Sequence, residues 1–329
     1  DEEHGVRLMK PIPNGGNISK MNRLHEIDAE KLEQAGHGQG FIAALDQSGG
    51  STPKALKGYG IEEDVYTVNG VRDEAKMFDL VHEMRTRVIK SPEFNGQKIM
   101  GAILFEMTMD RTIDGLGTAE YLWEKKHVVP FLKCDKGLAD EEHGVRLMKP
   151  IPNLDALLER AVSHGVFGTK MRSVINHFDE QGIKAVVDQQ FAIGEQIAEH
   201  GLVPILEPEC TITAPDREKS EQLMTEEFKK HLATLDPEVK IMIKIAIPVN
   251  PHQYDELLND PHVVRIVALS GGYSRDEANE KLKKCPGIIA SFSRALLADL
   301  RAQQTEEEFD GAIKAAIDSI FDASVNKVA

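Results

Sequence analysis

The chain has few cysteines, few aromatic residues and no long apolar run. Its three cysteines, Cys134, Cys210 and Cys285, are widely spaced and form no CxxC pair, which weighs against a disulfide framework or a cysteine-bound zinc. No apolar run approaches the roughly eighteen residues that cross a bilayer, and no basic patch followed by an apolar stretch marks a secretory signal. We therefore expect a cytoplasmic protein with free, buried thiols.

Basic charge is also scarce. The 329 residues include 39 Lys and Arg against 54 Asp and Glu, which gives a net charge of -15. A surface of this sign repels the phosphate backbone of nucleic acids. We expect no nucleic-acid partner and no membrane partner, and a phosphorylated small molecule would have to bind in a locally basic pocket. The sequence leaves open whether the chain forms a homo-oligomer.

The first fourteen residues are a copy of an internal segment. The sequence DEEHGVRLMKPIPN occurs at 1–14 and again at 140–153, an identity too long for chance. The second copy lies between an apolar run and an amphipathic segment, whereas the first is followed by GGNISK and Met21. We expect residues 1–20 to be an added segment of artificial origin, and residues 21–329 to form a single domain.

Short apolar runs alternate with longer segments of helical period, a pattern typical of repeated βα units and a parallel sheet. Eight such units favour a closed (β/α)8 barrel, a TIM barrel of the α/β class, over an open doubly wound sheet. Predicted helices span 74–89, 154–164, 183–200, 276–284 and 307–322. The predicted strands span 41–46, 99–105, 128–133, 166–171, 202–207, 240–247, 263–270 and 287–293.

Polar residues end or interrupt seven of the eight apolar runs, where a barrel places its chemistry. A single charge at a strand end usually faces solvent, but Lys244 lies between Ile243 and Ile245. Burial of an unpaired ammonium lowers its pKa, and nearby cations such as Lys170 and Lys133 lower it further. A neutral amine at neutral pH is a nucleophile toward carbonyl carbon. The pattern indicates carbonyl chemistry through an iminium ion.

Two short segments rich in serine and glycine could bind anions. Ser270, Gly271 and Gly272 follow the seventh run, and Arg294 follows the eighth, which is the usual phosphate site of a barrel. A second cluster, residues 46–51, follows the first run and offers Ser48 and Ser51. Glycines in loops are more often plain turn residues. Two anion pockets on either side of a lysine-lined mouth would fit a bisphosphate.

Ligands for a metal are not evident. No histidine stands at the carboxyl end of a predicted strand, so a zinc-dependent mechanism lacks its usual ligands. Carboxylates could hold magnesium, but the interleaved lysines would compete with it. We expect neither a metal nor a cofactor.

Seven motifs, in this order and spacing, make residues 40–326 resemble class I fructose-bisphosphate aldolases, and more closely their bacterial branch. The resemblance implies a lyase of glycolysis and gluconeogenesis that cleaves fructose 1,6-bisphosphate through a lysine Schiff base. The motifs are GFIAALDQSGGS (40–51), GAILFE (101–106), FLKCDKG (131–137), FGTKMR (167–172), VPILEPE (203–209), LSGGYS (269–274) and SFSRAL (291–296).

The resemblance also implies roles for individual residues. Lys244 would form the Schiff base, Glu207 would act as acid and base while water is lost, and Asp46, assisted by Lys170, would deprotonate the hydroxyl beside the cleaved bond. Lys133 and Arg172 would line the pocket. One phosphate would bind at Ser270, Gly271, Gly272 and Arg294, and the other at Ser48, Ser51 and Lys133.

Three features depart from the family pattern. Lys244 is followed by Ile-Ala-Ile-Pro rather than by proline and asparagine, so Lys170 is the alternative nucleophile. Gln47 stands where animal members have glutamate, and the chain ends in DASVNKVA without the terminal tyrosine of those enzymes. Two other interpretations are another Schiff-base sugar-phosphate aldolase or transaldolase, and a catalytically silent phosphosugar-binding barrel.

Overall fold

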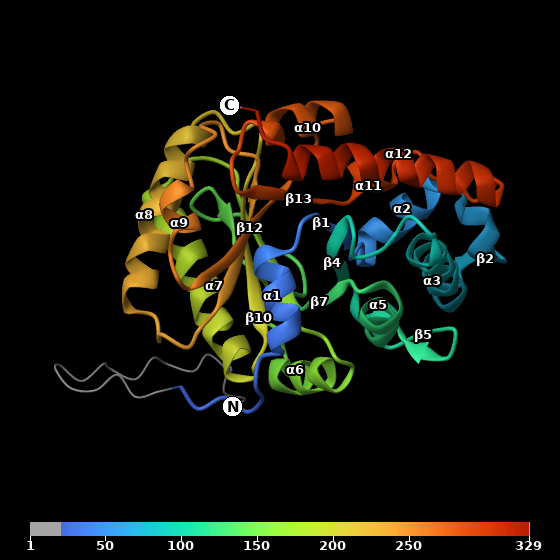
Figure 1. Ribbon diagram of the computed structural model, residues 1–329, viewed down its shortest axis with the longest axis horizontal. Coiled ribbons are helices and arrows are strands. Elements are labelled where there is room, and N and C mark those ends of the chain that lie inside the picture. The colour runs from blue at the N-terminus through green and yellow to red at the C-terminus, as the bar shows by residue number, and fades with distance from the viewer. Residues whose placement is uncertain (1–20, 329) are drawn as a thin grey trace.

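Eight parallel strands close into a barrel in the computed structural model, which describes residues 21–328 (Figure 1). Each strand pairs with the next in chain order, β13 pairs with β1, and β9 pairs with β10, which completes the circle. The predicted (β/α)8 barrel is confirmed. Its strands are β1 (Phe41–Leu45), β4 (Ile99–Leu104), β7 (Val129–Lys133), β9 (Gly168–Ile175), β10 (Val203–Cys210), β11 (Ile241–Ala246), β12 (Val263–Leu269) and β13 (Ile288–Phe292).

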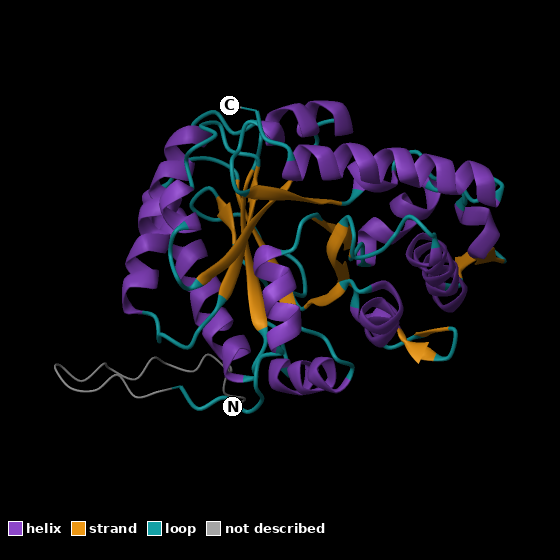
Figure 2. Ribbon diagram, in the orientation of Figure 1, coloured by secondary structure: helices purple, strands orange, loops and turns teal. Residues whose placement is uncertain are grey.

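Helices surround the strands (Figure 2). Because the strands are covered on the outside by helices and filled on the inside by side chains, they are apolar along almost their whole length. All five predicted helices are confirmed, with ends that shift by a few residues. The helices between and after the strands are α3 (Glu74–Lys90), α5 (Thr118–Lys126), α6 (Leu154–Ser163), α7 (Glu180–Glu199), α8 (Arg217–Thr234), α9 (Asp255–Leu258), α10 (Arg275–Lys283) and α12 (Glu306–Val325).

Polar caps begin several of these helices. The Asp179 carboxylate accepts from the Gly182 N–H at the start of α7, and Thr305 and Glu308 form a capping box at the start of α12. The shorter elements are α1 (Ala29–His37), α2 (Thr52–Gly58), α4 (Glu106–Met109), α11 (Arg294–Leu297), the 3-10 turns η1 (Gly49–Ser51) and η2 (Glu63–Tyr66), and the short strands β2 (Thr67–Val68), β3 (Val71–Arg72), β5 (Thr112–Ile113), β6 (Leu116–Gly117) and β8 (Val145–Arg146).

Helix α1 covers the amino-terminal end of the barrel. The Gln34 amide donates to the Met100 and His127 carbonyls at 2.9 and 2.7 Å, and Arg265 Nε donates to the Ala35 carbonyl at 2.9 Å. Ala35 packs into the cluster that fills the barrel interior. Since this end is covered, the carboxyl-terminal end remains as the mouth.

Two strands are longer than the sequence predicts. β9 continues beyond residue 171 to Ile175, and β10 continues beyond residue 207 to Cys210. The extension has a partner, because β8 pairs antiparallel with the last part of β9, with Val145 opposite Ile175. Lys170 and Glu207 therefore lie within strands and not at their ends.

The predicted added segment, residues 1–20, lies outside the described residues. Among residues 21–328, no helix is both long enough and apolar enough to reach across a bilayer.

Candidate active site

Inward-facing positions of the barrel change from apolar to polar toward its mouth. Side chains alternate between the two faces of a strand, so Val203 and Ile205 of β10 share a face with Glu207, and Met242 of β11 shares a face with Lys244. The apolar members belong to the interior cluster, and both polar ones are buried. The same change brings Asp46, Lys133, Lys170 and Ser291 to the mouth.

Lys170 is held as a cation by two carboxylates. Its Nζ lies 2.6 Å from Asp46 Oδ2 and 3.3 Å from Glu207 Oε2. Burial lowers the pKa of Lys170, but the opposing charges outweigh burial and raise it well above its usual value. Burial likewise raises the pKa of Asp46, yet Lys170 and Lys244 bring it down to about 2. Lys170 and Asp46 are therefore an ion pair at neutral pH.

Lys244 is in a different environment, although it lies in the same mouth. Its Nζ donates to the Ser291 hydroxyl at 3.0 Å, and it forms no ion pair with any residue in 21–328. Burial lowers the pKa of Lys244, and repulsion from Lys170 adds to this, against the opposite effect of Glu207 and Asp46. When two lysines in one site have pKa values shifted in opposite directions, they can serve different roles in a reaction. Lys244 is the amine that more readily becomes a nucleophile.

Glu207 has an oxygen without a hydrogen-bond partner next to Lys170. Only 3% of this residue is exposed, and its Oε2 has no hydrogen-bond partner among the described residues, although Lys170 Nζ lies 3.3 Å away. A buried polar atom of this kind is normally satisfied in the functional state. Glu207 can therefore exchange a proton with a group bound between Lys170 and Lys244.

A second set of charged residues lines one side of the mouth. Lys133 Nζ donates to the Ser48 hydroxyl at 2.6 Å and lies 3.9 Å from Asp135. Arg172 Nε donates to Glu209 at 2.6 Å, and its backbone N–H donates to Asp135 at 3.1 Å. The structure thus brings Lys133 and Arg172 to the mouth, as expected, and supports both through neighbouring carboxylates.

The loop after β1 brings Ser48, Ser51 and Lys133 together. The Ser51 hydroxyl donates to the Ser48 carbonyl and accepts from the Ser48 N–H, at 2.7 and 3.0 Å. Since Lys133 reaches the Ser48 hydroxyl from β7, these three residues form one cluster with hydroxyls and an ammonium. Such a cluster can bind an anion.

The turn after β12 requires glycine. Gly271 and Gly272 have φ of 63° and 112°, and a Cβ on Gly271 would lie 2.7 Å from Ile212 Cγ2. The Tyr273 N–H donates to the Ser270 carbonyl at 3.1 Å and closes the turn. Backbone N–H groups at a turn of this kind can bind an anion.

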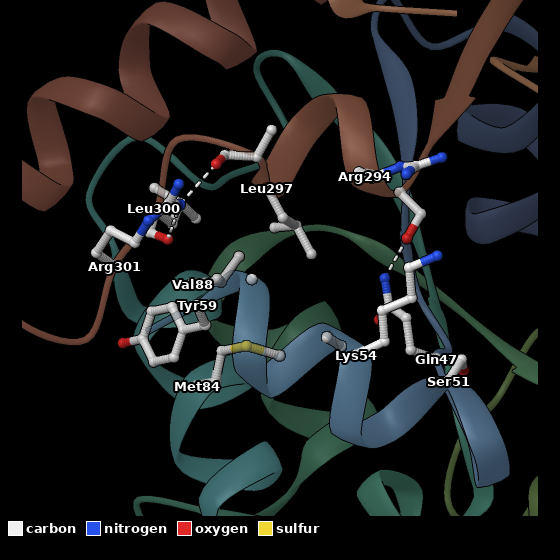
Figure 3. Close-up of a pocket in the computed structure, with 14 residues that line it drawn as sticks. Gln47, Ser51, Lys54, Tyr59, Met84, Val88, Arg294, Leu297, Leu300 and Arg301 are labelled. Carbon is white, nitrogen blue, oxygen red and sulfur yellow. Dashed lines mark hydrogen bonds between the residues drawn. The ribbon is translucent and has the colours of Figure 1, made fainter. Parts of the chain in front are cut away.

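Arg294 lies with the loop after β1. It lines a cavity of about 350 Å³ together with Gln47 and Ser51, above a floor of apolar side chains (Figure 3). Its side chain makes no hydrogen bond or ion pair with Ser270, Gly271 or Gly272 in the described part of the chain. The expectation that these four residues bind one phosphate stays a prediction.

Several residues of the mouth had no role assigned from sequence. Ser291 is the hydroxyl partner of Lys244, and Glu209 is the carboxylate partner of Arg172. Arg85 of α3 is buried beneath the loop after β1, where it donates to the Gln47 carbonyl and to Thr108. Arg85 lies on the apolar face of α3, and this position in the sequence pattern indicates that its side chain is buried.

One histidine lies just beyond the carboxyl end of a strand. His177 follows the carboxyl end of β9 by two residues, because β9 is longer than predicted. Within residues 21–328, no group of three or more His, Cys, Asp or Glu side chains is arranged to hold a metal ion.

Comparisons with known proteins bear on the fold. No family model matches the sequence. The chain is similar to fructose-bisphosphate aldolase from Plasmodium falciparum, solved in complex with TRAP and a small-molecule inhibitor, with a TM-score of 0.64 and 19% identity over 94% of this chain and 99% of that one. A Corynebacterium glutamicum protein gives a TM-score of 0.47 and 16% identity over 90% and 92% of the two chains. The similarity to the Plasmodium falciparum structure agrees with the (β/α)8 barrel fold.

Proposed function

We propose that the protein is a class I fructose-bisphosphate aldolase, which cleaves fructose 1,6-bisphosphate reversibly to dihydroxyacetone phosphate and glyceraldehyde 3-phosphate. One observation carries the proposal: two buried lysines share a mouth, but only Lys170 is paired with carboxylates, and the pKa of Lys244 is lowered by burial and by Lys170. This arrangement places an amine that loses its proton more readily beside a fixed cation, as Schiff-base chemistry requires.

Groups in the mouth can serve the steps up to cleavage of the carbon–carbon bond. Lys244 Nζ attacks the ketone carbon of the substrate, and Glu207 supplies and removes protons while water leaves and the iminium ion forms. Asp46 takes the proton of the C4 hydroxyl. The electrons of the C3–C4 bond then flow to the iminium nitrogen, which leaves an enamine and releases the aldehyde. Protonation of the enamine carbon and hydrolysis restore Lys244.

The two anion-binding elements support a substrate with a phosphate at each end. The cluster of Ser48, Ser51 and Lys133 follows β1 and reaches β7, whereas the Ser270–Tyr273 turn follows β12. Lys244 projects from β11, between these elements around the barrel. A ketose bisphosphate could contact both elements while its carbonyl meets Lys244.

The test is borohydride reduction in the presence of fructose 1,6-bisphosphate and EDTA, followed by peptide mapping. We expect a triose-phosphate adduct on Lys244, and none in the Lys244→Met variant. Lys327 is a matched control, because burial also lowers its pKa, to about 8. It lies two residues beyond α12, away from the mouth, and donates to the Leu282 and Ile288 carbonyls. Lys327→Met should leave the adduct intact.

Other outcomes would replace the proposal. An adduct on Lys170 keeps the Schiff-base mechanism but moves the nucleophile. An adduct formed with sugar monophosphates but not with the bisphosphate would favour another Schiff-base aldolase or a transaldolase. If no adduct forms, the class I mechanism is refuted, and phosphosugar binding without turnover would then indicate a silent barrel.

A further inference from the structure

A buried arginine outside the catalytic set joins two loops of the mouth. Arg217, the first residue of α8, is 7% exposed. One nitrogen of its guanidinium donates to the Ile247 carbonyl, just after β11, and another donates to the Tyr273 hydroxyl at 3.4 Å. A single side chain thus connects the strand of Lys244 to the turn after β12.

Glu221 holds this arginine from the next turn of α8. Its Oε1 lies 3.7 Å from Arg217 Nε and accepts from the Val249 N–H at 3.0 Å. Its second oxygen accepts from the Tyr254 hydroxyl at 3.3 Å. The carboxylate is 1% exposed, so it fixes the segment that follows β11 as well as the arginine.

A gain in folding stability does not explain why Arg217 and Glu221 are buried as a pair. Removing two charges from water costs about as much as their attraction returns, and apolar replacements are often neutral or stabilising. A buried polar network does, however, select one geometry, because each of its members needs a partner in a fixed direction. The pair therefore serves to fix the positions of the groups to which it is hydrogen-bonded.

Those groups lie next to two parts of the mouth, the strand that carries Lys244 and the turn after β12. Ile247 is three residues beyond Lys244 and directly follows the same strand, and Tyr273 ends the turn that begins at Ser270. The turn also rests on Ile212, in the segment that leads into α8, where Gly271 leaves no room for a side chain. The β10–α8 segment therefore supports the turn from below while Arg217 holds its end.

We propose that Arg217 is a positioning residue, which fixes the Ser270–Tyr273 turn relative to Lys244 so that a phosphate bound at the turn sets a carbonyl against Nζ. This inference rests on the function proposed above. Misplacement of reacting groups by about 1 Å can cost about a hundredfold in rate. The effect should be specific to substrates that carry the phosphate.

The experiment compares Arg217→Lys and Tyr273→Phe with the wild-type protein. In both variants we expect KM for fructose 1,6-bisphosphate and the inhibition constant of inorganic phosphate to rise about tenfold. A change of this size corresponds to the loss of one hydrogen bond to a charged group, here the bond between Arg217 and Tyr273. Borohydride trapping with dihydroxyacetone, which has no phosphate, should stay at the wild-type rate. A purely structural role would change trapping of both kinds of substrate.

Arg265→Lys is the matched control. Arg265 is a partly buried arginine that also donates to backbone carbonyls, those of Ala35 and Gly38, but it lies at the opposite end of the barrel. This variant should lose stability without a change in KM or in phosphate inhibition. If Arg217→Lys does not fold, Tyr273→Phe, which removes one hydroxyl, carries the test.

Two failures can be told apart. Wild-type values of KM and phosphate inhibition in Tyr273→Phe would overturn the inference while leaving the aldolase proposal intact. If the wild-type protein forms no Schiff base, the role of Arg217 can still be tested by measuring the affinity for inorganic phosphate by calorimetry. Weaker binding in the variants would support its positioning role, and equal or absent binding would overturn it.

Discussion

Replacing Asp46 by asparagine removes one charge from the mouth and leaves the shape of the side chain nearly unchanged. The carboxylate has a pKa of about 2 instead of 3.8, because Lys170 and Lys244 outweigh its burial. At about 1.4 kcal/mol for each tenfold change in proton affinity, the folded state gains about 2 kcal/mol from the ionised form. Asp46→Asn should lower the free energy of unfolding by this amount at pH 7.

The pH dependence of this loss follows from the sign of the shift. A lowered carboxyl pKa contributes stability that is complete above pH 3.8 and is lost as the pH falls toward 2. The difference between wild type and Asp46→Asn should therefore be constant from pH 5 to pH 8. Urea unfolding at several pH values within this range measures it.

The same variant should separate the steps of the reaction. Loss of a positioned base costs about 10²- to 10⁴-fold in the step that it serves, so cleavage should be slow. Asp46 also raises the pKa of Lys244, so its removal should leave Lys244 at least as neutral as before. Borohydride trapping should persist while turnover is lost.

A surface carboxylate provides the control. Asp318 on α12 is paired with Lys98 and Lys314, and its side chain is 39% exposed. Asp318→Asn should change stability by less than about 1 kcal/mol and leave turnover unchanged. The reasoning would be refuted if Asp46→Asn had wild-type stability, or if trapping disappeared together with turnover.

Three further predictions concern other buried groups. Burial raises the pKa of Glu221 to about 7 from 4.5, against the effect of Arg217, so the wild-type protein should lose roughly 3 kcal/mol of stability as the pH rises through this window. Urea unfolding at pH 5 and pH 8 should show that Glu221→Gln removes this loss, and parallel curves would contradict the assignment. Gly271→Ala should cost about 1–3 kcal/mol and raise KM, because alanine at φ 63° is strained and its Cβ would meet Ile212; unchanged unfolding curves would show that the turn adapts. Burial raises the pKa of each cysteine thiol, so iodoacetamide should label these residues only after unfolding, and rapid labelling of the native protein would contradict the burial of Cys134, Cys210 and Cys285.

The barrel could be predicted because its strands are buried on both faces. A strand such as Phe41–Leu45 must then be apolar throughout, and eight runs of this kind separated by helical segments leave few alternatives. The lengths of β9 and β10 could not be predicted, since Arg172 and Ser173 interrupt the apolar run of β9, and Glu207 and Glu209 interrupt that of β10. Those residues become strand because the distant segment at 145–146 pairs with β9.

The site was predicted in outline and not in detail. Flanking isoleucines were sufficient to mark Lys244 as buried, but the sequence could not decide between Lys244 and Lys170. That choice depends on side-chain neighbours within about 4 Å, and Asp46 and Glu207 come from other strands. A buried charge such as Arg85 is harder still to recognise, because charges on helices normally face solvent.

Closure of the barrel makes folding depend on the last strand. β1 pairs with β13, so Ile42 meets Ser291 across almost the whole described chain. Until residues 288–292 are present, one edge of β1 and one edge of β12 stay open and can pair with other chains. Contacts between such distant segments also slow folding. A chain that is still being synthesised, or is cut before β13, therefore exposes two unpaired strand edges. These edges should become paired only in the late steps of folding.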